Sequence, residues 1–236
     1  MMKSYENGTE TYCVYLAPAD MSGYNVCPNS KHCKELCLNG SGHNKIEILA
    51  RGEEKSHINQ ARIKKTKFFF EHKEEFMELL IQEIQSAKNK AEKDGKAFSV
   101  RLNGTSDLNP MLFTYMGRNI LEIFPNVQFY DYTKVPNHFG VAKRYPNYDI
   151  TFSFNGYNWI TCENYLKSGG KVAVVFDGKL PTEFKGYRVI DANEYDMRYI
   201  DPKSTIMGLT YHRVGRDYVN GKYHRPESKF VIKMDD

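Results

Sequence analysis

Several features are scarce or missing in this sequence of 236 residues. It has one tryptophan and five cysteines, and no apolar run approaches the roughly 18 residues that a membrane-spanning helix needs. The first residues, MMKSYENGTETYC, lack the apolar core of a secretory signal peptide. We therefore expect a cytoplasmic protein with no membrane partner, in which cysteine thiols stay reduced.

Common enzyme signatures are also missing. The sequence contains no phosphate-binding GxxxxGK[ST], no GxGxxG after a strand, no HExxH and no GxSxG. These absences exclude the usual nucleotide-binding loops, zinc proteases and serine hydrolases.

The remaining composition is that of an ordinary soluble protein, with 41% hydrophobic and 26% charged residues. A net charge of +4 permits a nucleic-acid partner but does not require one, because lysine and arginine are interleaved with acidic residues. We see no repeat or linker and expect a single domain over residues 1–236. It contains a cysteine loop at 20–45 and a basic C-terminal loop and strand at 212–236.

Short runs rich in aromatic and β-branched residues alternate with segments of helical periodicity. The expected helices are 53–94, 111–124, 138–144 and 158–170, and the tail 214–229 is expected to be a loop. About six to seven mainly parallel strands favour a partial (β/α) barrel, with a doubly wound sheet as the alternative. The expected strands are 11–18, 97–103, 127–133, 148–154, 171–176, 187–191 and 205–211, and a further final strand is expected at 230–234 after the tail loop.

Three cysteines lie within the stretch CPNSKHCKELC, at Cys27, Cys33 and Cys37. Thiolates are soft ligands that suit zinc or an iron–sulfur cluster, and this polar segment offers little core for buried thiols. Zinc would need a fourth ligand, for which His32 or His43 is nearby. A [4Fe–4S] cluster would instead leave one iron open to a small molecule. Cys13 and Cys162 lie in a strand and a helical pattern, and we expect both in the core.

Polar residues follow most of the predicted strands. The run RLNGTSDL places backbone N–H groups, a hydroxyl and a carboxylate after the second strand, where the rim of a barrel would bind ligands. In FYDYTK, alternation places Phe129, Asp131 and Thr133 on one face and the set Tyr130, Tyr132 and Lys134 on the other. The second set suits an aromatic-walled pocket, with Ser153 at the same rim.

The sequence resembles a family of bacteriophage proteins known as gene-product-88-like. The resemblance extends over nearly the whole chain and includes LAPADMSGYNVCP, ARIKKTKFFF, RLNGTSDL, FPNVQFYDYTK and VIDANEYDMRYIDP. Some relatives carry the label "rolling circle replication initiation protein". The family is similar in turn to the radical S-adenosylmethionine (SAM) enzymes. Those enzymes are partial (β/α) barrels with three cluster-binding cysteines after the first strand and a glycine-rich amine-binding motif after the second.

The resemblance implies a radical-SAM-like enzyme of the infected bacterium's cytoplasm, with a [4Fe–4S] cluster on the three cysteines. It implies that SAM is bound near Arg101, Asn103, Gly104, Thr105, Ser106, Asp107, Tyr130 and Ser153. The implied catalytic residues are Lys134, Asp107 and Tyr132, and the phage setting suggests a nucleotide or nucleic-acid substrate. The spacing C-x5-C-x3-C differs from the usual C-x3-C-x2-C of those enzymes, and GTSD replaces their GGEP.

The alternative is a zinc-stapled phage protein that binds nucleic acid in replication and catalyses nothing. The aromatic run Phe68 to Phe70 adjoins a basic stretch formed by Arg51, Arg62, Lys64, Lys65 and Lys67. Rolling-circle nickase chemistry does not fit, because that class needs two histidines flanking one hydrophobic residue. None of the seven histidines is separated from another by a single residue.

Overall fold

The computed structural model describes residues 2–4, 8–34, 36–212, 218–219, 222–223 and 228–234. The chain divides into two compact units, and the predicted single domain over 1–236 stays a prediction. The first unit contains Met1–Pro28, Arg62–Asp131 and Asn137–Ile150, and the second contains Asn29–Ala61, Tyr132–Pro136 and Thr151–Asp236.

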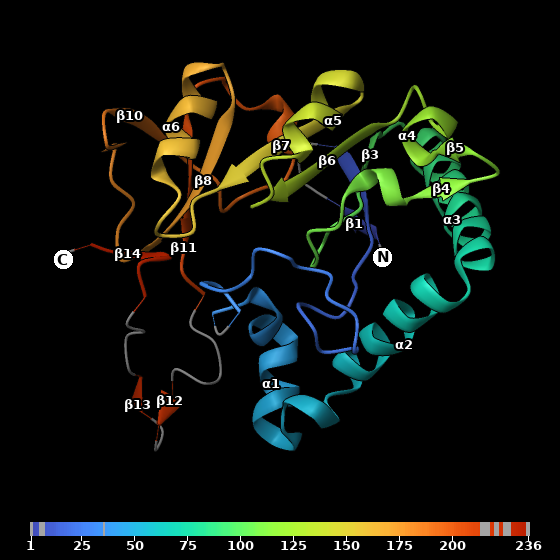
Figure 1. Cartoon of the computed structure of the whole chain (residues 1–236), viewed down its shortest axis with the longest axis horizontal. Coiled ribbons are helices and arrows are strands. Elements are labelled where there is room, and N and C mark those ends of the chain that lie inside the picture. The colour runs from blue at the N-terminus through green and yellow to red at the C-terminus, as the bar shows by residue number, and fades with distance from the viewer. Residues whose placement is uncertain are drawn as a thin grey trace. The chain divides into compact units, whose positions relative to one another are not determined.

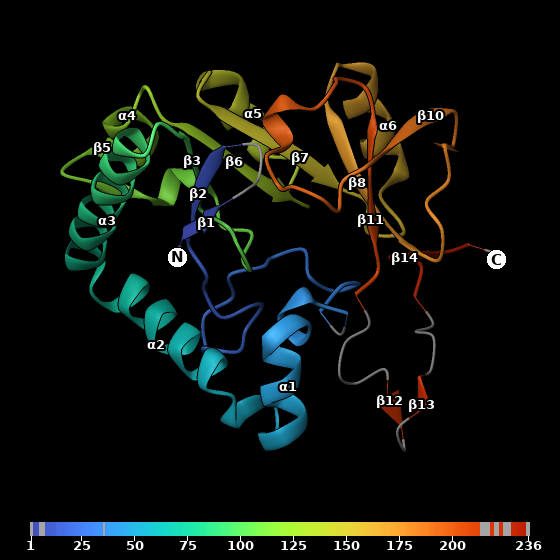
Figure 2. The ribbon, with the colours of Figure 1, turned by 180° about the vertical axis from the view of Figure 1, so that it is seen from behind.

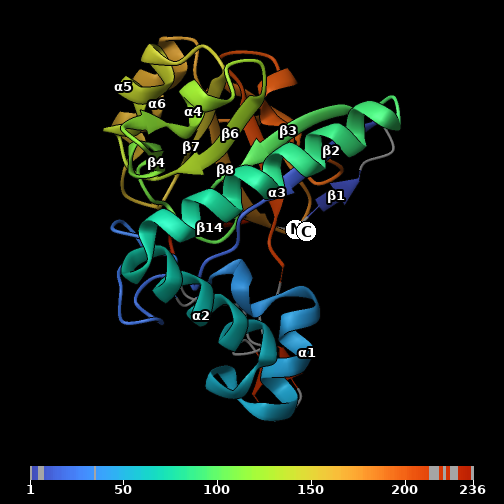
Figure 3. The same ribbon diagram turned by 90° about the vertical axis from the view of Figure 1, so that its right-hand side faces the viewer.

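The sheet of the first unit has the strand order β1-β2-β3-β6, and α3 packs against β2 and β3 (Figure 3). Strand β1 is antiparallel to β2, whereas β2, β3 and β6 are parallel. Helix α3 buries apolar residues at steps of three and four, from Phe76 through Leu80 and Ile84 to Ala91. The bounds are β1 Met2–Ser4, β2 Thr9–Cys13, β3 Ala97–Arg101, β6 Gln128–Thr133, α3 Lys73–Lys93 and α5 His138–Arg144.

The prediction of one helix over 111–124 is wrong. A 3-10 turn at Pro110–Leu112 leads into a hairpin of β4 (Thr114–Tyr115) and β5 (Arg118–Asn119), followed by the short helix α4 (Ile120–Ile123). The chain reverses at Met116 and Gly117, which both have positive φ, and this is the turn chemistry of a two-residue hairpin. The apolar spacing imitates a helix, but the Met-Gly turn interrupts it.

The predicted helix over 53–94 is divided. A 3-10 turn at Glu53–Lys55 precedes α2 (His57–Glu71), and α3 starts after His72, whose φ of −133° breaks the helical path. The structure also contains α1 (Gly42–Arg51), which the apolar pattern does not predict.

A buried polar network explains α1, because its anchor is an asparagine rather than an apolar stripe. Asn44 donates from Nδ2 to the carbonyl of Asn39 at 2.6 Å and to Oδ1 of Asn59 at 2.9 Å, and it accepts from Ser56 at 2.5 Å. All four residues are buried. Hydrophobic periodicity cannot detect a helix that is held through such contacts.

The second unit is built around β8, which pairs in parallel with β7, β11 and β14 (Figures 1 and 2). Strand β10 is parallel to β11 and antiparallel to β9, and α6 packs against β8. The bounds are β7 Tyr148–Ser153, α6 Trp159–Lys167, β8 Lys171–Asp177, β9 Glu183–Phe184, β10 Tyr187–Asp191, β11 Ile206–Thr210 and β14 Val231–Lys233. The smaller elements are 3-10 turns at Leu38–Gly40 and Arg198–Ile200 and the pair β12 Tyr218–Val219 and β13 Lys222–Tyr223.

The predicted mixed α/β class with mainly parallel strands is therefore confirmed. Seven of the expected strands and the helices at 138–144 and 158–170 appear within a few residues of their predicted positions. The strand expected at 11–18 instead covers Thr9–Cys13. Much of the predicted tail loop 214–229 lies outside the described residues.

Candidate functional site

The loop 103–108 follows β3 in the first unit, and the side chain of Asn103 fixes its shape. The Asn103 Oδ1 atom accepts hydrogen bonds from the Ser106 hydroxyl and from the backbone N–H of Leu108, both at 2.8 Å. Its Nδ2 atom donates to the Leu108 carbonyl at 3.0 Å. Asn103 is therefore used to close the loop on itself, as asparagine side chains do in tight turns.

A buried carboxyl group supports this loop from β6. Asp131 is 1% exposed, and its oxygens accept from the backbone N–H of Asn103 at 2.7 Å and from Asn103 Nδ2 at 3.1 Å. The hydroxyl of Tyr148 donates to the same carboxyl group at 3.2 Å. Burial raises the pKa of Asp131 to about 7, although Arg101 and these hydrogen bonds act in the opposite direction. Burial and the adjacent carboxyl group raise the pKa of Tyr148 well above its usual value.

The sequence analysis did not single out Asp131. It assigned the pocket to the opposite face, but the structure buries Tyr130 completely, with its hydroxyl 3.5 Å from the hydroxyl oxygen of Thr11. The available signal was a carboxylate in the middle of an otherwise aromatic strand, since a buried charge demands partners.

The loop lies very close to the segment that continues β2. The N–H of Gly104 donates to the Val14 carbonyl at 2.9 Å, and the Thr105 hydroxyl donates to the Leu16 carbonyl at 2.5 Å. A Cβ atom on Gly104 would come within 2.8 Å of the Tyr15 ring, so this close approach needs glycine. These groups, which the sequence offered for a ligand, are thus bonded within the protein.

Asp107 presents the carboxylate of this loop, and it contacts a histidine that the sequence analysis did not select. The Nδ1 atom of His138, at the start of α5, lies 3.6 Å from Asp107 Oδ1. His138 is 2% exposed, and burial lowers its pKa while Asp107 opposes this shift. Burial therefore favours the neutral imidazole, which can accept a proton.

The first cysteine of the triplet lies against the same loop. The Cys27 thiol donates to the Thr105 carbonyl at 3.8 Å, and the Asp107 N–H donates to the carbonyl of Val26 at 2.8 Å. Sequence reasoning placed the cysteine segment and the GTSD loop at one rim, and this contact agrees with that placement for Cys27.

Cys33 and Cys37 belong to the second unit and lie in successive turns. The Cys33 N–H donates to the Ser30 carbonyl at 3.0 Å, and the Gly40 N–H donates to the Cys37 carbonyl at 2.9 Å. The N–H of Asn39 donates to Cys37 Sγ at 3.5 Å. In the part of the chain that is described, no group of three or more His, Cys, Asp or Glu side chains is arranged to hold a metal ion. The convergence of the three thiols stays a prediction.

The two cysteines outside the triplet are in the core, as predicted. Cys13 is 1% exposed in β2 and Cys162 is fully buried in α6, where burial raises its thiol pKa to about 12. The three cysteines of the triplet are only half-buried. The chain therefore keeps two chemically different sets of thiols.

The other predicted site residues lie in the second unit. Tyr132 packs beside the buried Ala173 and Met207, and the Ser153 carbonyl accepts from Asn158 at 3.1 Å. The Lys134 ammonium lies 5.4 Å from the centroid of the Phe230 ring. Their place in one pocket with the loop 103–108 stays a prediction.

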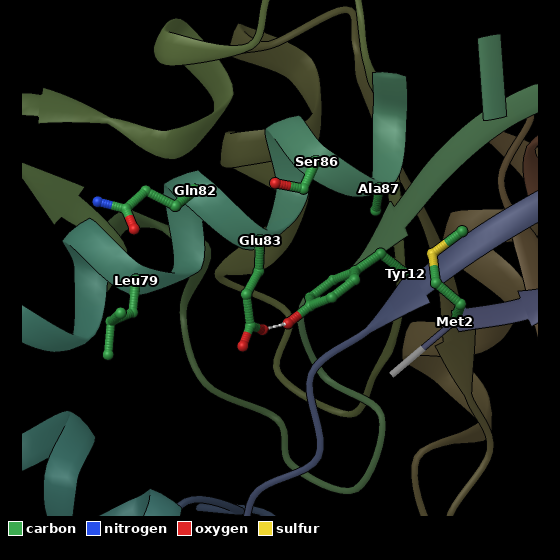
Figure 4. Close-up of a pocket in the computed structure, with 7 residues that line it drawn as sticks. All are labelled: Met2, Tyr12, Leu79, Gln82, Glu83, Ser86 and Ala87. Atoms are coloured by element: carbon green, nitrogen blue, oxygen red, sulfur yellow. Dashed lines mark hydrogen bonds between the residues drawn. The ribbon is translucent and has the colours of Figure 1, made fainter. Parts of the chain in front are cut away.

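The first unit also has a shallow groove of about 500 Å³ between β1, β2 and α3 (Figure 4). The Tyr12 hydroxyl donates to Glu83, and both residues line the groove together with the apolar Leu79 and Met2. None of the predicted site residues is among those that line it.

These features define an α/β protein with mainly parallel strands and a polar loop that the first cysteine contacts. The sequence matches the model of the family described as Gene product 88 over residues 2–226, and the protein belongs to this family. The resemblance to gene-product-88-like bacteriophage proteins is thus confirmed. No curated protein and no solved structure matches. Over the described residues, no helix combines the length and apolarity needed to cross a membrane.

Proposed function

We propose that this protein is a radical-SAM-like metalloenzyme on a partial (β/α) barrel, acting in the cytoplasm of the infected bacterium. Cys27, Cys33 and Cys37 would bind one [4Fe–4S] cluster, and the loop 103–108 would help to hold SAM. The contact between Cys27 Sγ and the Thr105 carbonyl carries this proposal. It brings the first cysteine against the loop that, on this proposal, would correspond to the amine-binding motif of radical SAM enzymes.

The donor set suits a thiophilic metal centre. All three cysteines are half-buried and lie outside helices and strands, which lets their sulfurs approach a shared ion more readily than the buried Cys13 and Cys162. The hydrogen bond from the Asn39 N–H to Cys37 Sγ stabilises a thiolate, the form that binds metals. Soft thiolates favour an iron–sulfur cluster or zinc over a hard cation.

Within the loop, Asp107 is the residue proposed to contact the ligand. Its carboxylate suits a cationic amine, and the neutral His138 at 3.6 Å can hold or accept a proton beside it. Asn103 and Gly104 act by shaping the loop, while Tyr132, Lys134 and Ser153 are proposed to line the substrate pocket. When bound, the cluster supplies the electron for reductive chemistry. The proposed substrate is a nucleotide or nucleic acid.

The test is anaerobic purification followed by iron, sulfide and zinc analysis and an absorption spectrum. We expect iron and sulfide with a broad visible band, lost in Cys33→Ala but kept in the control Cys162→Ala, whose thiol is buried in α6. Reduced protein should cleave SAM to 5′-deoxyadenosine, and Asp107→Asn should weaken SAM binding roughly tenfold through loss of one charge-assisted contact.

Purified protein that carries one zinc ion and no iron would overturn the proposal of a radical-SAM-like enzyme. It would favour the alternative, a zinc-stapled binding protein. One observation favours that second candidate. On α2, Lys64 and Lys67 are exposed, and Phe70, three residues after Lys67, stacks on Tyr24 with 4.4 Å between ring centroids. Salt-dependent DNA binding that survives Asp107→Asn but is lost in Lys64→Met and Lys67→Met would support it.

A further inference from the structure

The second unit carries an exposed cluster of rings and cations next to the cysteine segment. Tyr157, in the loop after β7, is 60% exposed. Its ring centroid lies 4.3 Å from that of His32, the residue before Cys33, and 4.9 Å from the Lys229 ammonium. Residues that are far apart in the sequence therefore meet around one accessible aromatic ring.

A second lysine lies against the ring of the residue that follows Lys229. The Lys134 ammonium lies 5.4 Å from the ring centroid of Phe230, the neighbour of Lys229, and the Lys134 carbonyl accepts from Asn29 Nδ2 at 2.8 Å. We call His32, Lys134, Tyr157, Lys229 and Phe230 the cationic rim.

The loop that carries Tyr157 is held before any ligand arrives. Asn155 and Asn158 exchange hydrogen bonds at 2.9 and 3.0 Å, and Asn155 Oδ1 also accepts from the Tyr157 N–H at 2.9 Å. Gly156 touches the backbone of Lys229, where an added Cβ atom would lie 2.6 Å from the Lys229 carbonyl carbon. An aromatic side chain on a fixed loop loses little conformational entropy on binding.

We propose that the cationic rim binds a nucleotide through its phosphate and its base. The two ammonium groups supply the charge that a phosphate needs, and Tyr157 with His32 offers ring surface on which a base can stack. The same chemistry is present in a free nucleotide and in single-stranded nucleic acid. This inference rests on the proposed function and deepens it by assigning the binding of its nucleotide or nucleic-acid substrate to the cationic rim.

Calorimetric titration of the full chain with thymidine 5′-monophosphate, thymidine and single-stranded oligothymidylate tests the rim. We expect the monophosphate to bind more tightly than thymidine. Lys134→Met and Lys229→Met should each weaken its binding about tenfold, because each removes one charge-assisted contact. Tyr157→Ala should weaken all three ligands about tenfold through lost stacking. The control is Lys167→Met, which removes an exposed lysine that pairs with Glu163 at 3.1 Å on α6 and should change nothing.

Titrations are run on chelator-treated and on cluster-loaded protein, so that nucleotide binding is scored separately from the metal. Binding of either phosphate-bearing ligand supports the rim. Binding of the monophosphate alone indicates a free nucleotide, and binding of the oligonucleotide alone indicates single-stranded nucleic acid. Circular dichroism tests whether each variant is folded. If Lys229→Met is not folded, Lys229→Gln is used in its place. Equal affinity of the two lysine variants and the wild type, or no binding of either phosphate-bearing ligand, overturns the proposal even if iron is present.

Discussion

Each unit contains a buried aspartate, and the two carboxyl groups are stabilised by different kinds of partner. Asp131 accepts hydrogen bonds from neutral donors, the amide groups of Asn103 and the Tyr148 hydroxyl, and the charge of Arg101 acts on it as well. Asp201 Oδ2 lies 3.1 Å from Nε of Arg198, and both of these side chains are 1% exposed. The second contact is an ion pair rather than an aligned hydrogen bond, since neither atom meets hydrogen-bond geometry.

The difference between the two sites is a difference in charge compensation. Arg198 is a permanent cation, held further by the Tyr195 carbonyl and by its ring at 4.6 Å, so the second site is an electrically neutral pair. At Asp131 burial outweighs the opposing effects of Arg101 and the neutral donors, and the pKa rises to about 7. The Asp131 carboxyl group therefore changes its charge near physiological pH, and this is the group that supports the loop 103–108.

Breaking the ion pair should have the largest effect. Arg198→Met leaves the Asp201 carboxylate buried without its cation, and we expect the free energy of unfolding to fall by about 3–5 kcal/mol in urea denaturation. The control is Arg188→Met at an exposed position of β10, which should change stability by less than about 0.5 kcal/mol. The double variant Arg198→Met/Asp201→Asn should regain part of the loss. Wild-type stability in Arg198→Met would show that the pair contributes nothing.

The pH dependence of stability sharpens the comparison at Asp131. Its folded-state pKa of about 7 exceeds the ordinary value of 3.8, so the folded protein binds more protons between these values. Asp131 therefore makes its full contribution to the free energy of unfolding below about pH 4. This contribution, at most roughly 4 kcal/mol, is lost as pH rises through about 7.

The measurement is the difference in unfolding free energy between the wild type and Asp131→Asn at each pH. The wild type should gain on the variant as pH falls from about 8 to about 5. His138 acts in the opposite direction because its pKa is lowered, but it is present in both proteins and cancels. A difference that does not change with pH would contradict the raised pKa.

The smallest effect concerns the close approach of the loop 103–108 to the Tyr15 segment. Gly104→Ala should destabilise the protein by about 1–3 kcal/mol, because the new methyl group meets the Tyr15 ring and the Val14 carbonyl at 2.8 Å. Gly140→Ala in α5 meets nothing within 4 Å and should be neutral or stabilise by up to about 1 kcal/mol. Thermal unfolding compares the two variants with the wild type. Equal melting temperatures of Gly104→Ala and the wild type would show that the loop tolerates the methyl group.

Local sequence patterns were sufficient for most elements of this fold. Alternating and apolar runs identified strands such as Lys171–Asp177, and the helix at His138–Arg144 was predicted with its observed ends. Patterns failed at 111–124, where a Met-Gly turn overrides helical spacing, and at α1, where the anchoring residue is the buried Asn44. In both cases the deciding interactions are hydrogen bonds and backbone angles, which hydrophobic periodicity does not record.

For the candidate site, the sequence by itself determined the residue types: three thiols clustered in a polar segment, two thiols expected in the core, and a polar loop after a predicted strand. Only the tertiary structure decided which polar groups remain for chemistry. In the structure, the N–H of Gly104 and the hydroxyl of Thr105 donate hydrogen bonds to backbone carbonyls, and Asp107 is paired with His138. The tertiary structure also brought Tyr157, His32 and Lys229 together from three distant segments. The physical reason is that burial and long-range contacts set the cost of each polar group, and neither is fixed by sequence neighbours.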